Sequence, residues 1–207
     1  MGIDEAGRGC VLGDLVIGAF VCDDPDDMAL REAGANDSKA LTPARRLAAR
    51  EALAPHGIAH VRHITARQID AENLNRLEEA VILELVRLAR PDVVYLDALG
   101  HPRTLPALAR RLQEQLPADL QHVTWTIEPK ADATYAVVGA ASIFAKTVRD
   151  EVLQSLVDAF GELGSGYPGD PKTKAWLTDW SRTGAPWPHF VRTRWATVAE
   201  MAQPAMW

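Results

Sequence analysis

Short apolar runs separated by glycine-rich turns predict that the chain begins with strands. Residues 1–5, 15–22 and 58–65 are rich in aliphatic side chains and are bounded by polar or turn-forming residues, which is the pattern of strands. The glycines within residues 7–13 lie between the first two runs and favour a tight turn. We therefore expect the chain to open with an antiparallel meander of three strands.

Helical patterns follow the meander. A threonine followed by a proline predicts the N-terminus of a helix at residues 42–54, because these residue types suit the N-cap and the first helical position. Residues 65–68 have the composition of a capping box. Apolar residues spaced three or four apart predict another helix over residues 71–89, because this spacing places them on one face.

Strands and helices alternate in the rest of the chain. The expected elements are a fully buried strand at 92–97, a helix at 103–116, a strand at 122–127 and a long helix at 138–160. Alternation after a meander predicts an α/β fold, with a mixed sheet flanked by helices. Residues 161–171 are rich in glycine and proline, so we expect a single domain over residues 1–207 whose part from about 161 to 207 is a small helical C-terminal extension.

Composition is that of an ordinary globular chain. Of the 207 residues, 47% are hydrophobic and 24% are charged, and the two cysteines are too few for a disulfide framework. No apolar run approaches the roughly 20 residues that a membrane span requires, and the first residues lack the layout of a signal peptide. We expect a cytoplasmic monomer without membrane association.

The net charge of −6 argues mildly against a protein that coats nucleic acid nonspecifically, but the charge is unevenly distributed. Residues 171–195 reverse the balance and combine basic side chains with tryptophans, namely Lys172, Lys174, Arg182, Arg192 and Arg194 with Trp176, Trp180, Trp187 and Trp195. This segment could grip a nucleic-acid backbone. It could equally be a tryptophan-rich helical subcore with a solvated face.

Acidic residues interrupt three otherwise apolar stretches. Asp4 and Glu5 end the first expected strand, Asp97 ends the strand at 92–97, and Asp132 precedes the long helix. A carboxylate at a buried strand end is costly unless a cation or hydrogen bonds compensate it, so convergence of several acids would indicate a divalent metal site. Carboxylates suit Mg²⁺ or Mn²⁺, and no cluster of histidine and cysteine in the sequence points to zinc.

Each acid also has a purely structural interpretation. Asp4 and Asp97 could accept hydrogen bonds from neighbouring loop amides, and Asp132 could complement a helix dipole. Asp4 and Glu5 are neighbours on a strand, where successive side chains point to opposite faces, so both side chains cannot reach one ion in the same way. Glu5 could bend around the strand end or contribute its backbone carbonyl.

The motifs around these acids resemble those of ribonuclease HII, the type 2 ribonuclease H. The order Asp-Glu-Ala-Gly-Arg-Gly after a first strand is the most specific of them. The likeness covers nearly the whole chain and is carried by residues 4–9, 36–39, 95–97, 130–135, 140–146 and 164–168. The surroundings of Asp97 and Asp132 resemble those of archaeal or eukaryotic members more than those of bacterial members. The resemblance implies a ribonuclease H-like fold.

The activity implied by this resemblance is that of a metal-dependent endoribonuclease. Its substrates would be the RNA strand of RNA/DNA hybrids and duplex DNA with embedded ribonucleotides, which it would cut on the 5′ side of the ribonucleotide to leave a 5′-phosphate and a 3′-hydroxyl. The family's catalytic and metal-binding acids correspond to Asp4, Glu5, Asp97 and Asp132, which would bind two Mg²⁺ or Mn²⁺ ions about 4 Å apart.

Six residues correspond to the family's substrate-binding positions, namely Gly7, Arg8, Gly9, Lys39, Lys146 and Tyr167. The Gly-Arg-Gly loop would read the ribose 2′-hydroxyl through its backbone, which distinguishes RNA from DNA. The tyrosine would pack on the sugar of the next nucleotide, and the lysines would face phosphates. From the residues alone, the tyrosine could instead be a packing residue and the lysines ordinary solvated side chains.

Two other functions remain open at this point. A DNA-only nuclease of the same superfamily would use the same acids without needing a ribose. A non-catalytic nucleic-acid binding subunit would keep the fold, although an intact set of acids speaks against it. Gln203 and Met206 also form a partial match to a sliding-clamp binding peptide, but the aromatic pair that should follow is missing.

Overall fold

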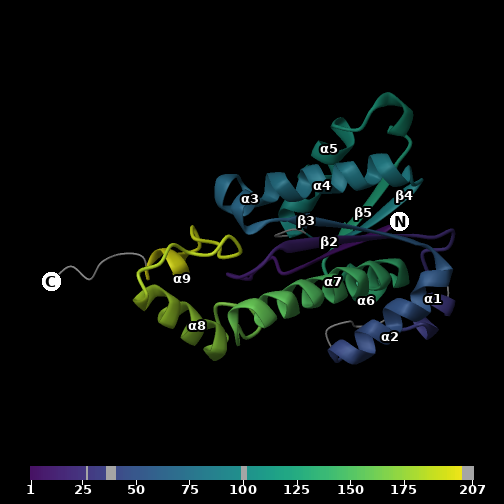
Figure 1. The fold of residues 1–207 in the computed structure, drawn as a ribbon. Helices are drawn as coiled ribbons and strands as arrows, with labels where there is room; N and C mark the ends of the chain where they lie inside the picture. Colours follow the sequence, from purple (N-terminus) through teal and green to yellow (C-terminus); the bar gives the residue numbers. More distant parts are fainter. Residues whose placement is uncertain (27, 36–40, 99–101, 202–207) are drawn as a thin grey trace.

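A mixed sheet of five strands forms the centre of the molecule (Figure 1). The structure is a computed structural model and describes residues 1–26, 28–35, 41–98 and 102–201. The strands are β1 (Gly2–Ala6), β2 (Leu15–Val21), β3 (Ile58–Ile64), β4 (Val93–Asp97) and β5 (Thr124–Glu128). Their order in the sheet is β3-β2-β1-β4-β5.

Strand pairing confirms the predicted meander. β1 pairs with β2, and β2 with β3, in antiparallel orientation, whereas β4 lies parallel to both β1 and β5. Ile3 is the register partner of Leu96, so Asp4 and Asp97 each follow this pair by one residue on adjacent strands. The parallel pairing therefore brings acids that are far apart in the sequence to the same end of the sheet.

Helices cover both faces of this sheet (Figure 1). They are α1 (Met28–Glu32), α2 (Pro43–Leu53), α3 (Ala66–Ala71), α4 (Leu74–Ala89), α5 (Leu105–Glu114), α6 (Ala131–Thr134), α7 (Ala136–Phe160), α8 (Pro171–Arg182) and α9 (Ala196–Ala199). Apolar residues of α4 and α5 pack on one face, and those of α7, α1 and α2 pack on the other. None of the described helices is both long and apolar enough to cross a bilayer.

The long helix α7 lies directly against β1 and β2 because glycines face it. A Cβ on Gly2 would lie 2.3 Å from the carbonyl oxygen of Val137, and one on Gly18 would lie 2.5 Å from that of Ala141. No side chain fits in such a gap. This close packing brings the N-terminal part of α7, including Ser142, beside the end of β1.

Most expected elements form, with local differences. The capping box of Thr65 and Gln68 is present, and Thr42 caps α2. The helix expected at 71–89 instead begins at Leu74, because Asn73 accepts a hydrogen bond from the amide of Arg76 and so caps α4. β4 is not buried throughout as predicted: its residues alternate between buried and partly exposed. The short helix α1 was not expected.

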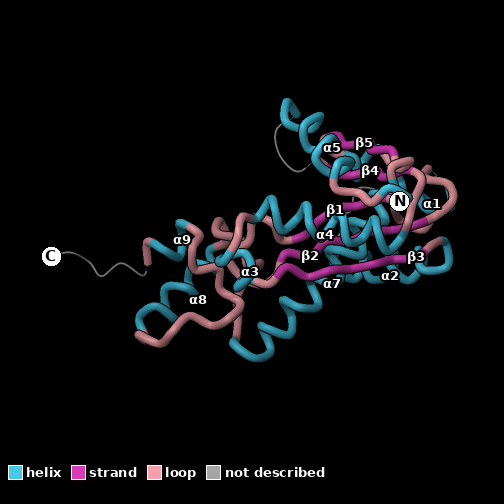
Figure 2. Tube along the Cα trace, turned by 90° about the horizontal axis from the view of Figure 1, so that it is seen from above, coloured by secondary structure: helices cyan, strands magenta, loops and turns pink. Residues whose placement is uncertain are grey.

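The C-terminal part packs beyond one end of the sheet (Figure 2). Trp176, Trp187, Trp195 and the end of α7 pack against a buried cluster that includes Leu12. Of the two interpretations of residues 171–195, this arrangement supports the tryptophan-rich helical subcore. Arg192, counted in the sequence with the basic residues that could grip nucleic acid, is instead fully buried.

Candidate active site

Three of the predicted acids converge at the end of the central strands. Asp4, Asp97 and Asp132 each offer one carboxylate oxygen, and these three atoms all lie within 4.8 Å of one another. Asp4 and Asp132 are buried, each 4% exposed, and Asp97 is partly buried. Oxygen ligands at this spacing match the preference of Mg²⁺ and Mn²⁺, so this acidic cluster is suited to binding a divalent metal.

Strand ends and a short helix position these side chains. Asp97 is the last residue of β4, and its Oδ1 accepts hydrogen bonds from the amides of Ala98 at 3.1 Å and Ala131 at 3.0 Å. The second bond ties the end of β4 to α6, which carries Asp132 in its first turn. Asp4 Oδ1 accepts from the amide of Glu5 at 2.8 Å. These bonds orient the carboxylates but leave their charges close together.

Glu5 lies apart from this cluster, on the opposite face of β1. Asp4 shares its face with Gly2 and Gly18 and is close to Ser142 and Lys146 of α7. The Glu5 side chain belongs to the α4 side, where the negative charge of Glu78 acts on it. Alternation along the strand was therefore a correct expectation. Among the described residues, the three-carboxylate group does not include Glu5, although Glu5 lines the same cavity.

Burial and nearby negative charges disfavour ionisation of Asp4 and Glu5. Burial raises the pKa of Asp4 to about 6, the nearby charge of Asp97 adds to this rise, and Ser142 and Lys146 oppose it. The pKa of Glu5 is raised well above its usual value, first by burial and then by Asp4 and Glu78. A divalent cation would favour the ionised form of each acid, so the donor set fits a metal electrostatically as well as geometrically.

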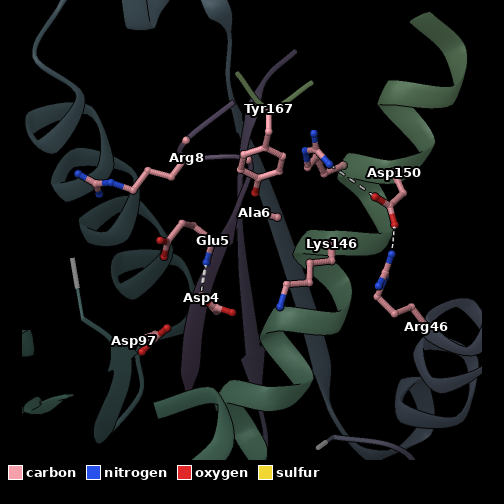
Figure 3. A pocket seen from close by; sticks show the side chains of 12 residues that line it. Asp4, Glu5, Ala6, Arg8, Arg46, Asp97, Lys146, Asp150 and Tyr167 are labelled. Carbon is pink, nitrogen blue, oxygen red and sulfur yellow. Dashed lines mark hydrogen bonds and ion pairs between the residues drawn. The ribbon is translucent and has the colours of Figure 1, made fainter. Parts of the chain in front are cut away.

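The Gly-Arg-Gly loop, residues 7–9, follows Asp4 and Glu5 in the chain and lies beside them. Gly7 has φ of +88°, and a Cβ there would lie 2.9 Å from the carbonyl oxygen of Asp14, so the turn requires glycine. The Arg8 side chain turns away from the acids, as Figure 3 shows, and donates to Glu78 Oε2 at 2.5 Å and Asn75 Oδ1 at 2.6 Å. Arg8 therefore presents its backbone, and not its guanidinium, to the cavity.

Asp4, Glu5 and Asp97 share one open cavity of about 380 Å³ with the loop (Figure 3). Its lining residues are Asp4, Glu5, Ala6, Gly7, Arg8, Gly9, Arg46, Asp97, Lys146, Arg149, Asp150 and Tyr167. Apart from Asp150, the acids lie on one side of this cavity and the cations from α2 and α7 lie on the other. Such a division suits a phosphodiester, because the cations can neutralise phosphates while the acids bind metal.

The sequence predicted Lys146 as a substrate residue but not Arg46 and Arg149. Together these three side chains form what we call the cationic wall of the cavity. Arg46 Nη2 donates to Asp150 Oδ2 at 2.6 Å, and Arg149 Nη1 lies 3.7 Å from Asp150 Oδ1, so one carboxylate aligns two arginines (Figure 3). Arg149 and Asp150 follow Lys146 by three and four positions on α7. This helical spacing was the signal that could have found them.

The other predicted substrate residues fall into two groups. Lys146 and Tyr167 line the cavity; Lys146 Nζ donates to Ser142 Oγ at 2.8 Å, and Tyr167 is 43% exposed beside Gly9. The guanidinium of Arg149 lies 5.4 Å from the centre of the Tyr167 ring. Lys39 and the tail residues Gln203 and Met206 lie outside the described residues.

Sequence and structure comparisons agree on one family. Residues 1–198 match the family model described as Ribonuclease HII. Ribonuclease HII of Thermofilum pendens is 40% identical over 95% of this chain and 95% of the relative. Ribonuclease HII of Archaeoglobus fulgidus is 34% identical over 99% of this chain and 97% of the relative.

Solved structures give the same result for the fold. The crystal structure of ribonuclease H2 from Pyrococcus horikoshii has a TM-score of 0.87 at 37% identity and covers 97% of this chain and 95% of that chain. A structure of a PCNA:RNase HII complex from Archaeoglobus fulgidus has a TM-score of 0.85 at 34% identity, covering 99% and 97%. The mixed sheet and its helices thus have the arrangement of these archaeal enzymes.

Proposed function

The chain belongs to the ribonuclease HII family, an endoribonuclease family, and from this premise we propose that it cuts on the 5′ side of ribonucleotides embedded in duplex DNA. We also propose that it hydrolyses the RNA strand of RNA/DNA hybrids. Each cut would leave a 5′-phosphate and a 3′-hydroxyl. The observation that carries the proposal is the convergence of three carboxylates within 4.8 Å of one another, two of which, Asp4 and Asp97, line one cavity with the Gly-Arg-Gly loop.

The acids would bind the metal. Asp4, Asp97 and Asp132 supply the clustered oxygens, and Glu5 would contribute from the other face of β1 or through its carbonyl. When bound, two Mg²⁺ or Mn²⁺ ions supply activation of the attacking water and stabilisation of the leaving oxygen. The hydrogen bonds from Ala98 and Ala131 hold the Asp97 carboxylate in a fixed orientation, so the protein need not reorganise when substrate arrives.

The remaining residues would recognise the substrate. The backbone of Gly7, Arg8 and Gly9 would contact the ribose 2′-hydroxyl, which only RNA provides. Tyr167 would pack on the sugar of the next nucleotide, which its exposed ring beside Gly9 supports. Lys146 would face phosphate, and Lys39 has the same role by family resemblance alone.

Cleavage of matched duplexes tests this function. A duplex with one ribonucleotide, an all-DNA duplex of the same sequence and an RNA/DNA hybrid would be incubated with Mg²⁺ and with Mn²⁺, and the product ends would be identified by mass spectrometry. We expect cutting of the ribonucleotide duplex and the hybrid, with no cutting of the all-DNA duplex. Equal cutting of all three would indicate a DNA nuclease, and binding without cutting would indicate a non-catalytic subunit.

Wider features of the protein are part of the same proposal. We expect a cytoplasmic monomer in which residues 1–207 form one domain with a helical extension from about residue 161. The Archaeoglobus fulgidus relative has been solved as a PCNA complex, which supports binding of a sliding clamp by this chain too. The partial motif at Gln203 and Met206 would be the contact, and its truncation should weaken clamp binding without changing cleavage of short duplexes.

A further inference from the structure

We propose that Arg192 is a positioning residue for the Gly-Arg-Gly loop and sets the preference for a ribonucleotide over a deoxyribonucleotide at the cleavage position. The inference rests on the proposed function, because it concerns how the same site recognises its substrate. It assigns a recognition role to the C-terminal part of the chain, from a residue 184 positions away from Arg8.

Arg192 is a fully buried cation whose donors all serve one loop. Its Nη2 donates to the carbonyl oxygen of Gly7 at 2.8 Å, Nη1 to that of Arg8 at 2.9 Å, and Nε to that of Gly13 at 3.1 Å. The ring of Trp195 lies 5.5 Å from the guanidinium carbon. Burying a charge is costly unless its hydrogen bonds are satisfied, and here the loop carbonyls satisfy them.

Fixing these carbonyls also fixes the amides that face the substrate. In a planar trans peptide the carbonyl of one residue and the N–H of the next point in opposite directions. Bonds to the carbonyls of Gly7 and Arg8 therefore direct the N–H groups of Arg8 and Gly9 away from Arg192. Gly7, Arg8 and Gly9 line the cavity, and no hydrogen bond joins either amide to another residue in the described part of the chain. These donors are available to a 2′-hydroxyl.

Attachment of the C-terminal part does not depend on the Arg192 side chain. Backbone bonds already join the two segments: the amide of Arg192 donates to the carbonyl of Val11 at 2.9 Å, and the amide of Gly13 to that of Phe190 at 2.8 Å. The amide of Val11 also donates to Gly166 at 2.8 Å. Removing the guanidinium should therefore release the peptide planes of the loop before it detaches the C-terminal part.

Binding measurements separate positioning from general stability. Arg192→Met would be placed in an Asp97→Asn background, so that substrate is not consumed, and its affinity measured in Mg²⁺ for a duplex with one ribonucleotide and for the all-DNA duplex. Arg194→Met is the matched control, because Arg194 is an exposed cation on the same segment. Fluorescence anisotropy gives the ratio of the two affinities for each variant.

We expect Arg192→Met to reduce this ratio by about fivefold or more while affinity for the all-DNA duplex changes less than about twofold. Arg194→Met should leave the ratio unchanged. An unchanged ratio in Arg192→Met, or an equal loss of affinity for both duplexes, would overturn the inference. If Arg192→Met does not fold, Arg192→Lys tests the same point, because one ammonium cannot occupy the three donor positions; a wild-type ratio in that variant would also overturn it.

Failure of the proposed function gives a different result. In that case the protein with Arg192 intact would show no preference for the ribonucleotide duplex and would not cut it, and both proposals would fall together. Cleavage of the ribonucleotide duplex by the unaltered protein, combined with a retained preference in Arg192→Met, would overturn the positioning role alone.

Discussion

The acidic cluster and the Gly-Arg-Gly loop are adjacent in the cavity, yet they compensate buried charge in opposite ways. Three carboxylates converge at the cluster, and the pKa of Asp4 rises to about 6 because burial and Asp97 disfavour its ionised form. At the loop, burial lowers the pKa of Arg192 to about 10, so it stays charged at neutral pH and is satisfied by three carbonyls.

This difference separates two kinds of preorganisation. The loop is complete within the protein, because its charges already have partners and its geometry needs no ligand. The cluster instead brings three carboxylates within 4.8 Å of one another and disfavours the ionised form of Asp4, so it is suited to a cation that would relieve this repulsion. A metal-binding site stores unfavourable electrostatic energy that the metal relieves, whereas a recognition loop needs rigidity.

The largest effect should come from Asp97→Asn, which tests whether the cluster needs its charge. The substituted amide oxygen can still accept the bonds from Ala98 and Ala131, so the fold should be retained. We expect cleavage of a ribonucleotide duplex to fall at least about a hundredfold, because charge stabilisation of the reaction is lost. Cleavage rates and a thermal melt check this. Near-normal turnover with normal melting would refute the metal-binding role of Asp97.

Arg8→Met tests whether the loop depends on its charge partners. The change leaves Glu78, which is fully buried, without its cation, and we expect the free energy of unfolding at pH 8 to fall by about 3 kcal/mol. Burial raises the pKa of Glu78 to about 7 even with Arg8 present, so the loss should be smaller at pH 5, where Glu78 is protonated.

Urea denaturation at both pH values measures this effect, and Glu78→Gln is the matched background. With a neutral residue at position 78, Arg8→Met should cost much less. An equal cost in both backgrounds would show that Arg8 contributes through packing and not through its charge.

A pH series on the metal-free protein tests the stored repulsion at the cluster. Because the pKa of Asp4 is raised in the folded state from 3.8 to about 6, its contribution to stability is present at low pH and is lost as pH rises through that interval. Between pH 5 and pH 8 the free energy of unfolding in chelator should fall by about 1.4 kcal/mol from this group.

Asp4→Asn isolates this contribution from all other titrating groups. The difference between the pH profiles of the unaltered protein and the variant should equal the contribution of Asp4 to the free energy of unfolding. Saturating Mg²⁺ should restore the stability of the unaltered protein at pH 8. Identical profiles for the two proteins would mean that burial does not raise the pKa of Asp4.

The smallest predicted effect concerns the cationic wall, which lies opposite the cluster. Arg46→Met should weaken binding of a ribonucleotide duplex by less than about tenfold. It should also reduce the slope of log affinity against log salt concentration by about one, which is the change expected for the loss of one phosphate contact. Arg50, one turn further along α2 and paired with Glu151 at 2.6 Å, is the control. If Arg50→Met changes the salt dependence as much as Arg46→Met, the effect is one of net charge and not of a specific contact.

Local sequence patterns were sufficient for most of the sheet and for the acids. The meander, the capping box at Thr65 and the place of Asp97 at a strand end follow from nearest-neighbour chemistry, so they could be predicted. The break before Leu74 was missed, because Asn73 can cap a helix or continue a loop with similar ease and the apolar spacing runs across it.

By itself, the sequence determined the α/β pattern, the family motifs and the candidate metal ligands, because these depend on residue type and short spacing. Tertiary structure alone decided that Asp4, Asp97 and Asp132 meet while Glu5 faces α4, and that Arg192 is buried beneath the loop of residues 7–9. Such pairings join residues from distant parts of the chain. They depend on strand order and helix packing, which bring together groups whose local sequences do not indicate that they are in contact.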